Sequence, residues 1–507
     1  MKRPSLDILC PIARRLPDGL QPLLATSMTA VLAVASAALL LAGCASPGAP
    51  HAPLAMTPPA AIGLVPVAAD AGTPSVDAQW WRAFGDPALD ALVERALVGQ
   101  PGLQAAAARL TRAQALTETR SAAEGPQLGL DLSTTRQRFS ENGLIPPPFA
   151  GSLYNTSALQ AGGSWEFDFF GRNRSALDAA LGSERAAAAE LAAARTVLAA
   201  NIAHAYVGLA RLLAQRDVAE RTLAQREETR ALTRQRVRAG LDTQVELKQA
   251  DGALPDARQQ IEALNEQAQL ARHQLAALSA QPPEALAGLK PSLKALNLAP
   301  LPPQIGLDLL ARRADVVAAR WRVEASTQDV ASAHAEFYPN ISLVGFAGLS
   351  SMTLERLVQA GSRVYGIGPA LHLPLFDAGR LRANLHVRHA DLDAAIAAYN
   401  GALFDAAREV ADAGASAQSI ARQQVDQAAA QADAESAYDF ALQRYRAGLG
   451  PYLIVLAAEN AVLAQRRLGT ELRARQLDTQ VALSRALGGG YTPDVAETPV
   501  SGPQAAR

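Results

Sequence analysis

The chain has 507 residues, of which 49% are apolar, and its formal net charge at pH 7 is -1. This length suffices for two or three ordinary domains, and the mixed charges exclude the basic surface that nucleic-acid binding requires. Both cysteines, Cys10 and Cys44, lie in the first 44 residues, so we expect no structural disulfide.

The first 43 residues predict a secretory signal peptide. Basic residues precede an apolar run over about residues 30–41, which is too short to cross a bilayer comfortably. The run ends at Leu41-Ala42-Gly43-Cys44, which resembles a bacterial lipobox, so we expect Cys44 to carry the acyl chains of a mature lipoprotein. Ala45 stands where an aspartate tends to retain such lipoproteins at the inner membrane, and this implies the outer membrane. An ordinary signal peptide with an incidental cysteine is the alternative.

The region after the signal peptide begins with a tether and continues as an internal duplication. Residues 44–75 are rich in proline and alanine without periodicity, so we expect a lipid-anchored tether that cannot form a core. Further on, residues 126–130 match 339–343 at an offset of 213, whereas 171–172 and 238–241 match 379–380 and 446–449 at an offset of 208. About seventy residues therefore pass without an insertion in either copy, which indicates an element of fixed length.

Each copy is predicted to contain a helix, a pair of strands, a long helix and a returning helix. The run from Arg172 to Arg238 has no proline and is rich in good helix formers, which predicts a helix on the order of 100 Å long. In the second copy Leu385, Leu392 and Tyr399 recur every seven residues, as in a coiled coil. The predicted segments are repeat 1 at 76–290 (strands at about 127–139 and 154–169, long helix 172–239, return helix 243–280), a linker at 291–302, repeat 2 at 303–490 (strands at about 340–349 and 365–376, long helix 380–446, return helix 452–487) and a flexible tail at 491–507.

The strand segments alternate with a period of two, as in Leu128, Leu130 and Leu132 with polar or small residues between them. A soluble, half-buried sheet gives the same alternation, but strands of about ten residues with this pattern are also typical of a transmembrane β-barrel. Four strands cannot close a barrel, and open edges are not tolerated in lipid, so closure requires other copies of the chain. Two chains would supply eight strands and three would supply twelve.

Six short strings between about residues 76 and 490 follow an order and spacing that a known family shares. They are Trp80-Trp81-Arg82 with Phe84-Gly85-Asp86-Pro87, Arg312-Arg313-Ala314-Asp315, Phe337-Tyr338-Pro339-Asn340-Ile341-Ser342-Leu343, Gly368-Pro369-Ala370 with Pro374-Leu375-Phe376-Asp377, Gly379-Arg380, and Arg444-Tyr445-Arg446-Ala447-Gly448-Leu449. Together they resemble the outer membrane factor family, the TolC-like exit ducts of tripartite efflux systems, in its NodT-type lipoprotein branch.

The resemblance implies a mixed α/β membrane protein with an internal twofold repeat. Three chains would each contribute four strands to one twelve-stranded transmembrane β-barrel, which a long α-helical coiled-coil barrel continues across the periplasm. The partners it implies are a homotrimer, a periplasmic membrane-fusion adaptor, an inner-membrane exporter and outer-membrane lipid. Exported small molecules would pass through the duct without being chemically changed. The protein would be lipid-anchored in the outer membrane and would extend into the periplasm.

The turns at Gly240-Leu241 and Gly448-Leu449 are the candidate adaptor-docking tips. Glycine permits the positive φ that ends a helix, and the leucine after it would offer an exposed apolar contact. By the resemblance these residues, with Arg238 and Arg446 beside them, meet the adaptor. Plain helix termination is the alternative, and it explains the glycines fully but the leucines less well.

Family members often carry aspartates just after the second turn, where they ring the closed periplasmic entrance. Ile454 and Ala457 stand at those positions here, so an apolar or differently charged entrance is expected. Glu246, the first-copy equivalent of Ile454, could place carboxylates near the entrance together with Asp242 and Asp251. A solvated helix face is the alternative, because a charged side chain on a helix normally faces water.

Nothing in the sequence predicts catalysis or a metal site. His386 and His389 are one helical turn apart, but two ligands without a third are weak evidence for a metal. No phosphate-binding loop, HExxH or nucleophile elbow occurs, so we expect no enzyme and no cofactor. The alternative function is a lipid-anchored structural coiled coil of the envelope, which would not need strand pairs or matched turns. Residues 337–349 and 368–380 most resemble the corresponding residues of family members that serve exporters of aromatic acids such as fusaric acid. Multidrug exporters are the alternative partners.

Overall fold

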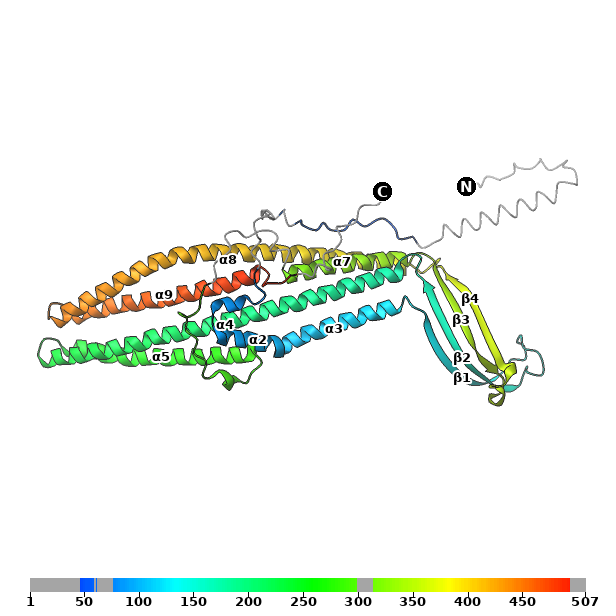
Figure 1. Ribbon diagram of the computed structural model, residues 1–507, viewed down its shortest axis with the longest axis horizontal. Helices are drawn as coiled ribbons and strands as arrows, with labels where there is room; N and C mark the ends of the chain where they lie inside the picture. Colours follow the sequence, from blue (N-terminus) through cyan, green and yellow to red (C-terminus); the bar gives the residue numbers. More distant parts are fainter. Residues whose placement is uncertain (1–45, 59–60, 62–75, 299–312, 493–507) are drawn as a thin grey trace, which may run out of the picture. The chain divides into compact units, whose positions relative to one another are not determined.

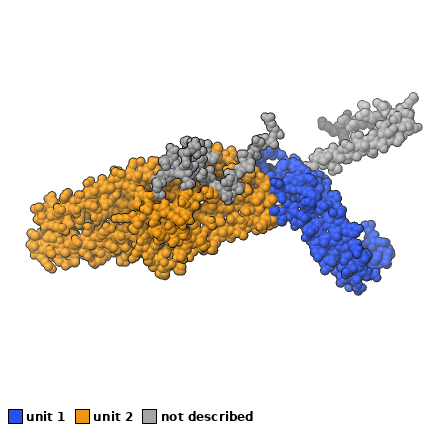
Figure 2. Space-filling view, viewed as in Figure 1, with its two compact units in different colours: residues 1–52, 121–176, 329–390 blue, residues 53–120, 177–328, 391–507 orange. Residues whose placement is uncertain are grey.

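The computed structural model describes residues 46–58, 61, 76–298 and 313–492 (Figure 1). The predicted signal peptide, Cys44 and the tail from residue 493 lie outside the described residues. The chain divides into two compact units (Figure 2). Residues up to 52, 121–176 and 329–390 form unit 1, which holds the sheet, and residues 53–120, 177–328 and 391–507 form unit 2, which holds most of the helical length.

The two copies of the duplication have matching elements. At the offset of 213 lie the 22-residue helices α3 (Pro101–Ala122) and α7 (Ala314–Ala335) and the 12-residue strands β1 (Gln127–Arg138) and β3 (Asn340–Ser351). At the offset of 208 lie the 67-residue helices α4 (Arg172–Arg238) and α8 (Arg380–Arg446) and the 35-residue helices α5 (Gln244–Leu278) and α9 (Tyr452–Ala486). The remaining strands differ in length, since β2 (Leu153–Phe167) has 15 residues and β4 (Arg363–His372) has 10. The two helices of each hairpin, the helix before the sheet and the first strand of each pair therefore have the same lengths in both copies.

Local capping explains where the long helices begin. Asp168 accepts from the backbone N–H of Arg174 at 2.8 Å at the start of α4, and Asp377 accepts from the N–H of Leu381 at 2.8 Å at the start of α8. Side-chain oxygens at these places satisfy amides that have no partner inside the helix. Helix α5 continues through Pro255 to Leu278. Short helical segments complete the copies: η2 (Trp80–Phe84), α2 (Pro87–Gly99), η3 (Pro283–Leu286), η4 (Leu354–Arg356) and η5 (Ala360–Ser362).

Unit 1 contains one antiparallel sheet in the order β1-β2-β3-β4. The register aligns Leu130 with Ala161, Ala161 with Ala347, and Ala347 with Tyr365. Because successive side chains of a strand point to opposite faces, residues aligned in this way lie on the same face. The outer strands of this sheet, β1 and β4, each pair with one neighbour among the described residues.

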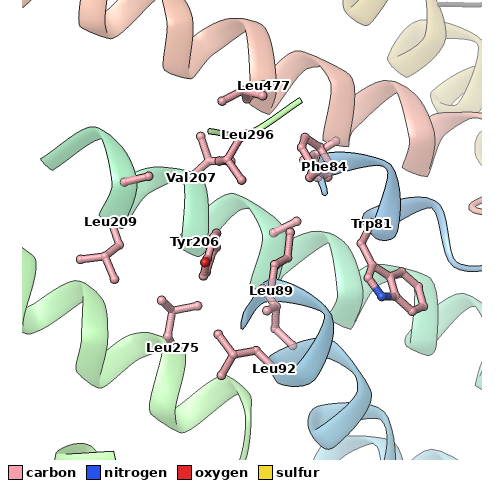
Figure 3. Close-up of a cluster of buried hydrophobic side chains, with 14 of the residues drawn as sticks. Trp81, Phe84, Leu89, Leu92, Tyr206, Val207, Leu209, Leu275, Leu296 and Leu477 are labelled. Carbon is pink, nitrogen blue, oxygen red and sulfur yellow. The ribbon is translucent and has the colours of Figure 1, made fainter. Parts of the chain in front are cut away.

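The main core of unit 2 brings η2, α2, α4, α5 and α9 together (Figure 3). The fully buried side chains of Phe84, Leu89 and Leu275 pack around Tyr206 of α4. The hydroxyl of Tyr206 donates to Asp86 Oδ2 at 2.6 Å, and Asp86 also caps α2 by accepting from Ala88 N–H. The tryptophan-containing string that marks the family resemblance therefore builds the core that joins α2 to the long helix.

The segment expected to be a linker after the first copy also enters this core. Leu293 and Leu296 are buried, and the N–H of Asn297 donates to the carbonyl oxygen of Phe84 at 3.0 Å. Arg473 of α9 donates to the carbonyl oxygen of Leu296 at 2.7 Å. Apolar burial and two backbone contacts fix residues 293–297 in place, so this part of the segment does more than connect the copies.

A second, smaller core lies near the far ends of the hairpins and joins them within one chain. It contains Tyr438 and Tyr445 of α8, Tyr452 and Val455 of α9, and Ala250 of α5. Among the described residues, α4 is the one helix long and apolar enough to cross a membrane, but 61% of the window concerned is buried inside the protein. That burial makes it weak evidence for a membrane span, because the core helix of a soluble protein passes the same test.

Candidate functional site

The first hairpin turn, between α4 and α5, is a Schellman motif. Gly240 has φ +74°, Leu241 N–H donates to Arg236 O at 2.9 Å, and Gly240 N–H donates to Val237 O at 3.1 Å. These bonds satisfy carbonyl groups at the end of α4. Nothing lies within 4 Å of a Cβ built on Gly240, so the backbone conformation, not space, calls for glycine. The side chain of Leu241 remains 64% exposed.

The second turn, between α8 and α9, repeats this geometry. Gly448 has φ +77°, Leu449 N–H donates to Arg444 O at 2.8 Å, and Gly448 N–H donates to Tyr445 O at 3.0 Å. Leu449 is 69% exposed. Both hairpins therefore end in the same backbone motif with an exposed leucine, and the neighbouring Arg238 and Arg446 are exposed as well.

A polar cluster links the two hairpins just behind the turns. Arg236 binds both carboxylate oxygens of Asp242, with Nε 2.9 Å from Oδ2 and Nη2 3.2 Å from Oδ1. Its third nitrogen, Nη1, donates to the carbonyl oxygen of Tyr445 in the other hairpin at 2.9 Å. The Tyr445 hydroxyl donates to Asp242 Oδ2 at 2.6 Å and lies 2.9 Å from Thr233 Oγ1. One guanidinium thus closes its own turn and holds the neighbouring hairpin.

The cluster is well shielded from water. The side chains of Arg236 and Asp242 are 11% and 8% exposed. Burial alone would raise the pKa of Asp242, but the hydrogen bonds from Arg236 and Tyr445 outweigh it and hold that pKa below its usual range. Burial, together with the hydrogen bond to Asp242, raises the pKa of Tyr445 to about 12. At neutral pH the cluster therefore contains one cation, one carboxylate and a neutral phenol.

This cluster is asymmetric between the copies. Arg444 is the second-copy equivalent of Arg236, but it donates to Leu449 O within its own turn at 3.3 Å. Gly450 replaces Asp242 at the offset of 208. The sequence offered a signal for the pair within the first turn, because Arg236 and Asp242 flank it with opposite charges. It offered none for the contact with Tyr445, which depends on how the hairpins pack.

The carboxylates considered for the periplasmic entrance are each engaged inside the chain. Asp242 belongs to the cluster just described, and Asp251 accepts from Arg230 Nε at 2.6 Å. Glu246 completes a capping box at the start of α5, in which it accepts from the N–H of Thr243 at 2.9 Å. Asp242 and Asp251 pair with arginines, whereas Glu246 is held by the backbone N–H and the hydroxyl of Thr243. The positions of the family's aspartates hold exposed apolar side chains, Ile454 (55% exposed) and Ala457.

The sheet of unit 1 has one apolar face and one mostly polar face. The apolar face includes Leu128, Leu130 and Leu132 of β1, Trp165 of β2, Leu343 of β3, and Tyr365, Ile367 and Leu371 of β4. Next to the loops that connect β1 to β2 and β3 to β4, the same face carries Arg136, Arg138 and Arg363. Leu128, Tyr365 and Ile367 are 85%, 84% and 78% exposed in the single chain. The opposite face carries Asp131, Gln160, Ser342 and His372, and its apolar side chains include Val344, Phe346 and Val364. A face this apolar is covered in nature by another surface or by lipid.

The described residues hold no cluster of three or more histidine, cysteine, aspartate or glutamate side chains that could bind a metal ion. His386 and His389 are thus not joined by a third ligand of this kind within the described part of the chain.

Comparisons with known proteins agree with this architecture. The family model described as outer membrane efflux protein matches residues 92–281 and 307–489. The chain is 39% identical over 377 residues to the fusaric acid resistance protein FusA of Burkholderia cepacia, covering 72% of this chain and 70% of that one. It is 33% identical over 463 residues to the multidrug resistance outer membrane protein MdtQ of Escherichia coli O157:H7, covering 89% and 96%.

Solved structures of outer-membrane proteins share the fold. The outer membrane protein VceC of Vibrio cholerae superimposes with a TM-score of 0.78 at 36% identity, covering 82% of this chain and all of that one. The outer-membrane channel OprN superimposes with a TM-score of 0.79 at 29% identity, covering 88% and 100%. The expected fold class is confirmed in the single chain, which combines four antiparallel strands with two long helical hairpins. The family match covers more than half of the chain, and the chain therefore belongs to the outer membrane efflux protein family.

Proposed function

We propose that three copies of this chain form one continuous export duct in the outer membrane. The observation that carries the proposal is the sheet, which has an apolar face on all four strands away from the connecting loops and is open at β1 and β4. A lipid-facing sheet cannot keep open edges, because unpaired backbone groups have no water to bind there. Pairing β4 of one chain with β1 of the next removes both edges, and three chains give twelve strands.

The helices continue the duct into the periplasm. Their fixed lengths in both copies follow if α4 and α8 must end at the same level, since both then carry a tip to the same partner. Exported molecules pass through without chemistry, so the protein acts as a passive conduit and not as an enzyme. Cys44 carries the acyl chains that anchor each chain in the outer membrane.

The tips dock on a periplasmic adaptor attached to an inner-membrane exporter. Leu241 and Leu449 supply exposed apolar contacts at matched positions, while Gly240 and Gly448 hold the turns in the conformation that presents them. The flanking Arg238 and Arg446 add positive charge near the helix C-termini, which also stabilises those ends.

The closed entrance is apolar in the second copy. Ile454 and Ala457 present no carboxylate, and the paired arginines neutralise Asp242 and Asp251. A Glu246→Gln change tests whether a carboxylate ring operates there, because glutamine retains the capping geometry and removes only the charge. We expect unchanged single-channel conductance and ion selectivity. A clear loss of cation selectivity would assign Glu246 to the entrance.

The cargo is a small exported molecule. FusA is named for fusaric acid resistance and MdtQ for multidrug resistance, which supports aromatic acids or drugs as the compounds moved. In this arrangement the exporter, not the duct, selects among them.

The proposal is tested by substituting one residue on each face of β1. Leu130→Arg places a charge on the apolar face, where lipid contact costs about 2–4 kcal/mol near the midplane, so assembled protein should disappear from the outer membrane and efflux should be lost. Ser133→Arg, on the other face of the same strand, should assemble and alter only the conductance measured in planar bilayers. Equal assembly of both variants would contradict a lipid-facing sheet and would favour the structural coiled coil instead.

A further inference from the structure

Part of the segment expected to be a free tether is bound to α8. The N–H of Leu54 donates to Asp393 Oδ1 at 2.9 Å, and the N–H of Thr57 donates to Asn400 Oδ1 at 2.8 Å. The side-chain amide of Asn400 returns a bond to the carbonyl oxygen of Ala55 at 3.1 Å. Asp393 and Asn400 are seven residues apart, two turns of the helix, and so lie on the same side of α8.

The hydrogen bonds from Asp393 and Asn400 all go to backbone groups of the segment. Pro53 and Pro58 enclose the bound residues, and proline fixes its own φ and restricts the residue before it. A chain that is stiff before binding loses less entropy when it binds. Side-chain oxygens spaced along a helix can therefore hold an extended segment without an apolar core beneath it.

The direction of the segment follows from a third contact. The ring of His51 lies 4.5 Å from the ring of His389 on α8. The order His51, Leu54, Thr57 thus runs parallel to the order His389, Asp393, Asn400. Moving back along the segment leads toward the start of α8, the end of the helix that follows β4.

The reach of the chain ahead of this contact matches the helix. His389 lies nine residues after Arg380, which corresponds to about 14 Å of helix. Cys44 precedes His51 by seven residues, which can span at most about 25 Å. The chain from His51 to Cys44 is therefore long enough to pass the start of α8.

We propose that residues 51–57 form a strap, docked on α8 by Asp393 and Asn400, that guides the N-terminal anchor along this helix toward its sheet-proximal end. The guiding role of the strap rests on the proposed function, because it requires the acyl anchor at Cys44. The docking of residues 51–57 on α8 does not depend on that anchor. Asp393 and Asn400 are positioning residues that fix where the anchored segment leaves the helical body.

Hydrogen exchange of the full-length protein in detergent, read on peptides covering residues 51–58, tests the docking. Only four amides lie between the two prolines, those of Leu54, Ala55, Met56 and Thr57. The strap predicts that Leu54 and Thr57 exchange roughly tenfold or more slowly than a free chain, since their N–H groups are bonded. Ala55 and Met56 should exchange at nearly the free rate.

Three variants and a control make the result specific. Asp393→Ala should release the slow amide at Leu54, and Asn400→Ala the one at Thr57. Thr57→Pro removes a donor from the strap and leaves α8 untouched, so it separates strap release from damage to the helix. Asp405→Ala, at an exposed aspartate of α8 that pairs with Arg408, should leave both amides slow.

The same exchange pattern is expected in a Cys44→Ala protein without the anchor, so a failure of lipidation would be distinguished from a failure of the strap. Four amides exchanging at the free-chain rate in the unaltered protein would overturn the proposal. So would two slow amides that persist in the Asp393→Ala/Asn400→Ala double variant.

Discussion

Arg236 Nη1, in the first hairpin, donates to the backbone carbonyl oxygen of Tyr445, in the second hairpin, at 2.9 Å. The same guanidinium holds Asp242 through its other two nitrogens, and Asp242 in turn accepts from the Tyr445 hydroxyl. The two hairpins of one chain are therefore tied at their tips by a closed ring of charge-assisted bonds, which are stronger than neutral ones.

Removing this tie should loosen the entrance. Arg236→Ala breaks three hydrogen bonds and leaves Asp242 shielded from water without its cation, so the closed arrangement of the tips loses stability. We expect the open fraction of single channels in planar bilayers to rise roughly tenfold, which corresponds to about 1.4 kcal/mol. The matched control is Arg444→Ala, at the equivalent residue, whose side chain donates to Leu449 O of its own turn. An open fraction that changes equally in both variants would contradict a specific role for Arg236.

Acid should have the same effect through Asp242. Its pKa in the folded protein is lowered by Arg236 and Tyr445 despite burial, so its ion pair stabilises the tips fully above the ordinary aspartate value near 4. The stabilisation is lost as the pH falls through the lowered pKa. Channels should therefore open more often below about pH 4, and Asp242→Asn should remove most of this response. A response to acid that is unchanged in Asp242→Asn would assign it to another group.

The exposed leucines at the tips should matter for docking and not for assembly. Leu241→Asp combined with Leu449→Asp places charges where an apolar contact is expected, so efflux should fall to the level of a deletion strain while the protein remains assembled in the outer membrane. The control pair is Leu270→Asp with Leu468→Asp, at exposed leucines of α5 and α9 away from the turns. Accumulation of a fluorescent efflux substrate in cells measures the outcome. Full efflux by the tip variant would remove the docking role.

A close approach of two helices should limit substitution at Gly182. A Cβ at this position of α4 would meet Ala325 of α7 at 3.1–3.2 Å, including backbone atoms. Gly182→Ala should therefore destabilise the protein by about 1–3 kcal/mol, because the helices must move apart. Gly252→Ala on α5 has open space and should stabilise by up to about 1 kcal/mol through helix propensity. Thermal melting followed by circular dichroism compares them, and a higher melting temperature for Gly182→Ala would show that the helices are not packed as described.

The sequence was most informative where structure is periodic. The absence of proline and the matched glycine turns placed α4 and α8 close to their observed bounds, and the period of two placed the four strands. These features depend on neighbouring residues in the chain, so they leave a local pattern. The strands of unequal length, β2 and β4, were less well bounded at their ends, where pairing partners decide how far a strand continues.

Other features depend on contacts between distant segments and leave no local pattern. Leu293 and Leu296 sit in a stretch without periodicity, yet they are buried by α4 and α9 partners far along the chain. The strap at residues 51–57 has the composition of a linker, and its contacts with His389, Asp393 and Asn400 lie more than 330 residues later in the chain. Tyr445 was visible as part of a family string, but its bond to Asp242 required the packed hairpins.

In the proposed assembly one chain supplies a third of a closed duct. Native mass spectrometry of the protein extracted from outer membranes in mild detergent tests it most directly. A dominant species with three times the mass of the mature chain is the predicted result. A species containing one or two chains, under conditions in which the helical signal of the protein is retained, would contradict the proposed trimer.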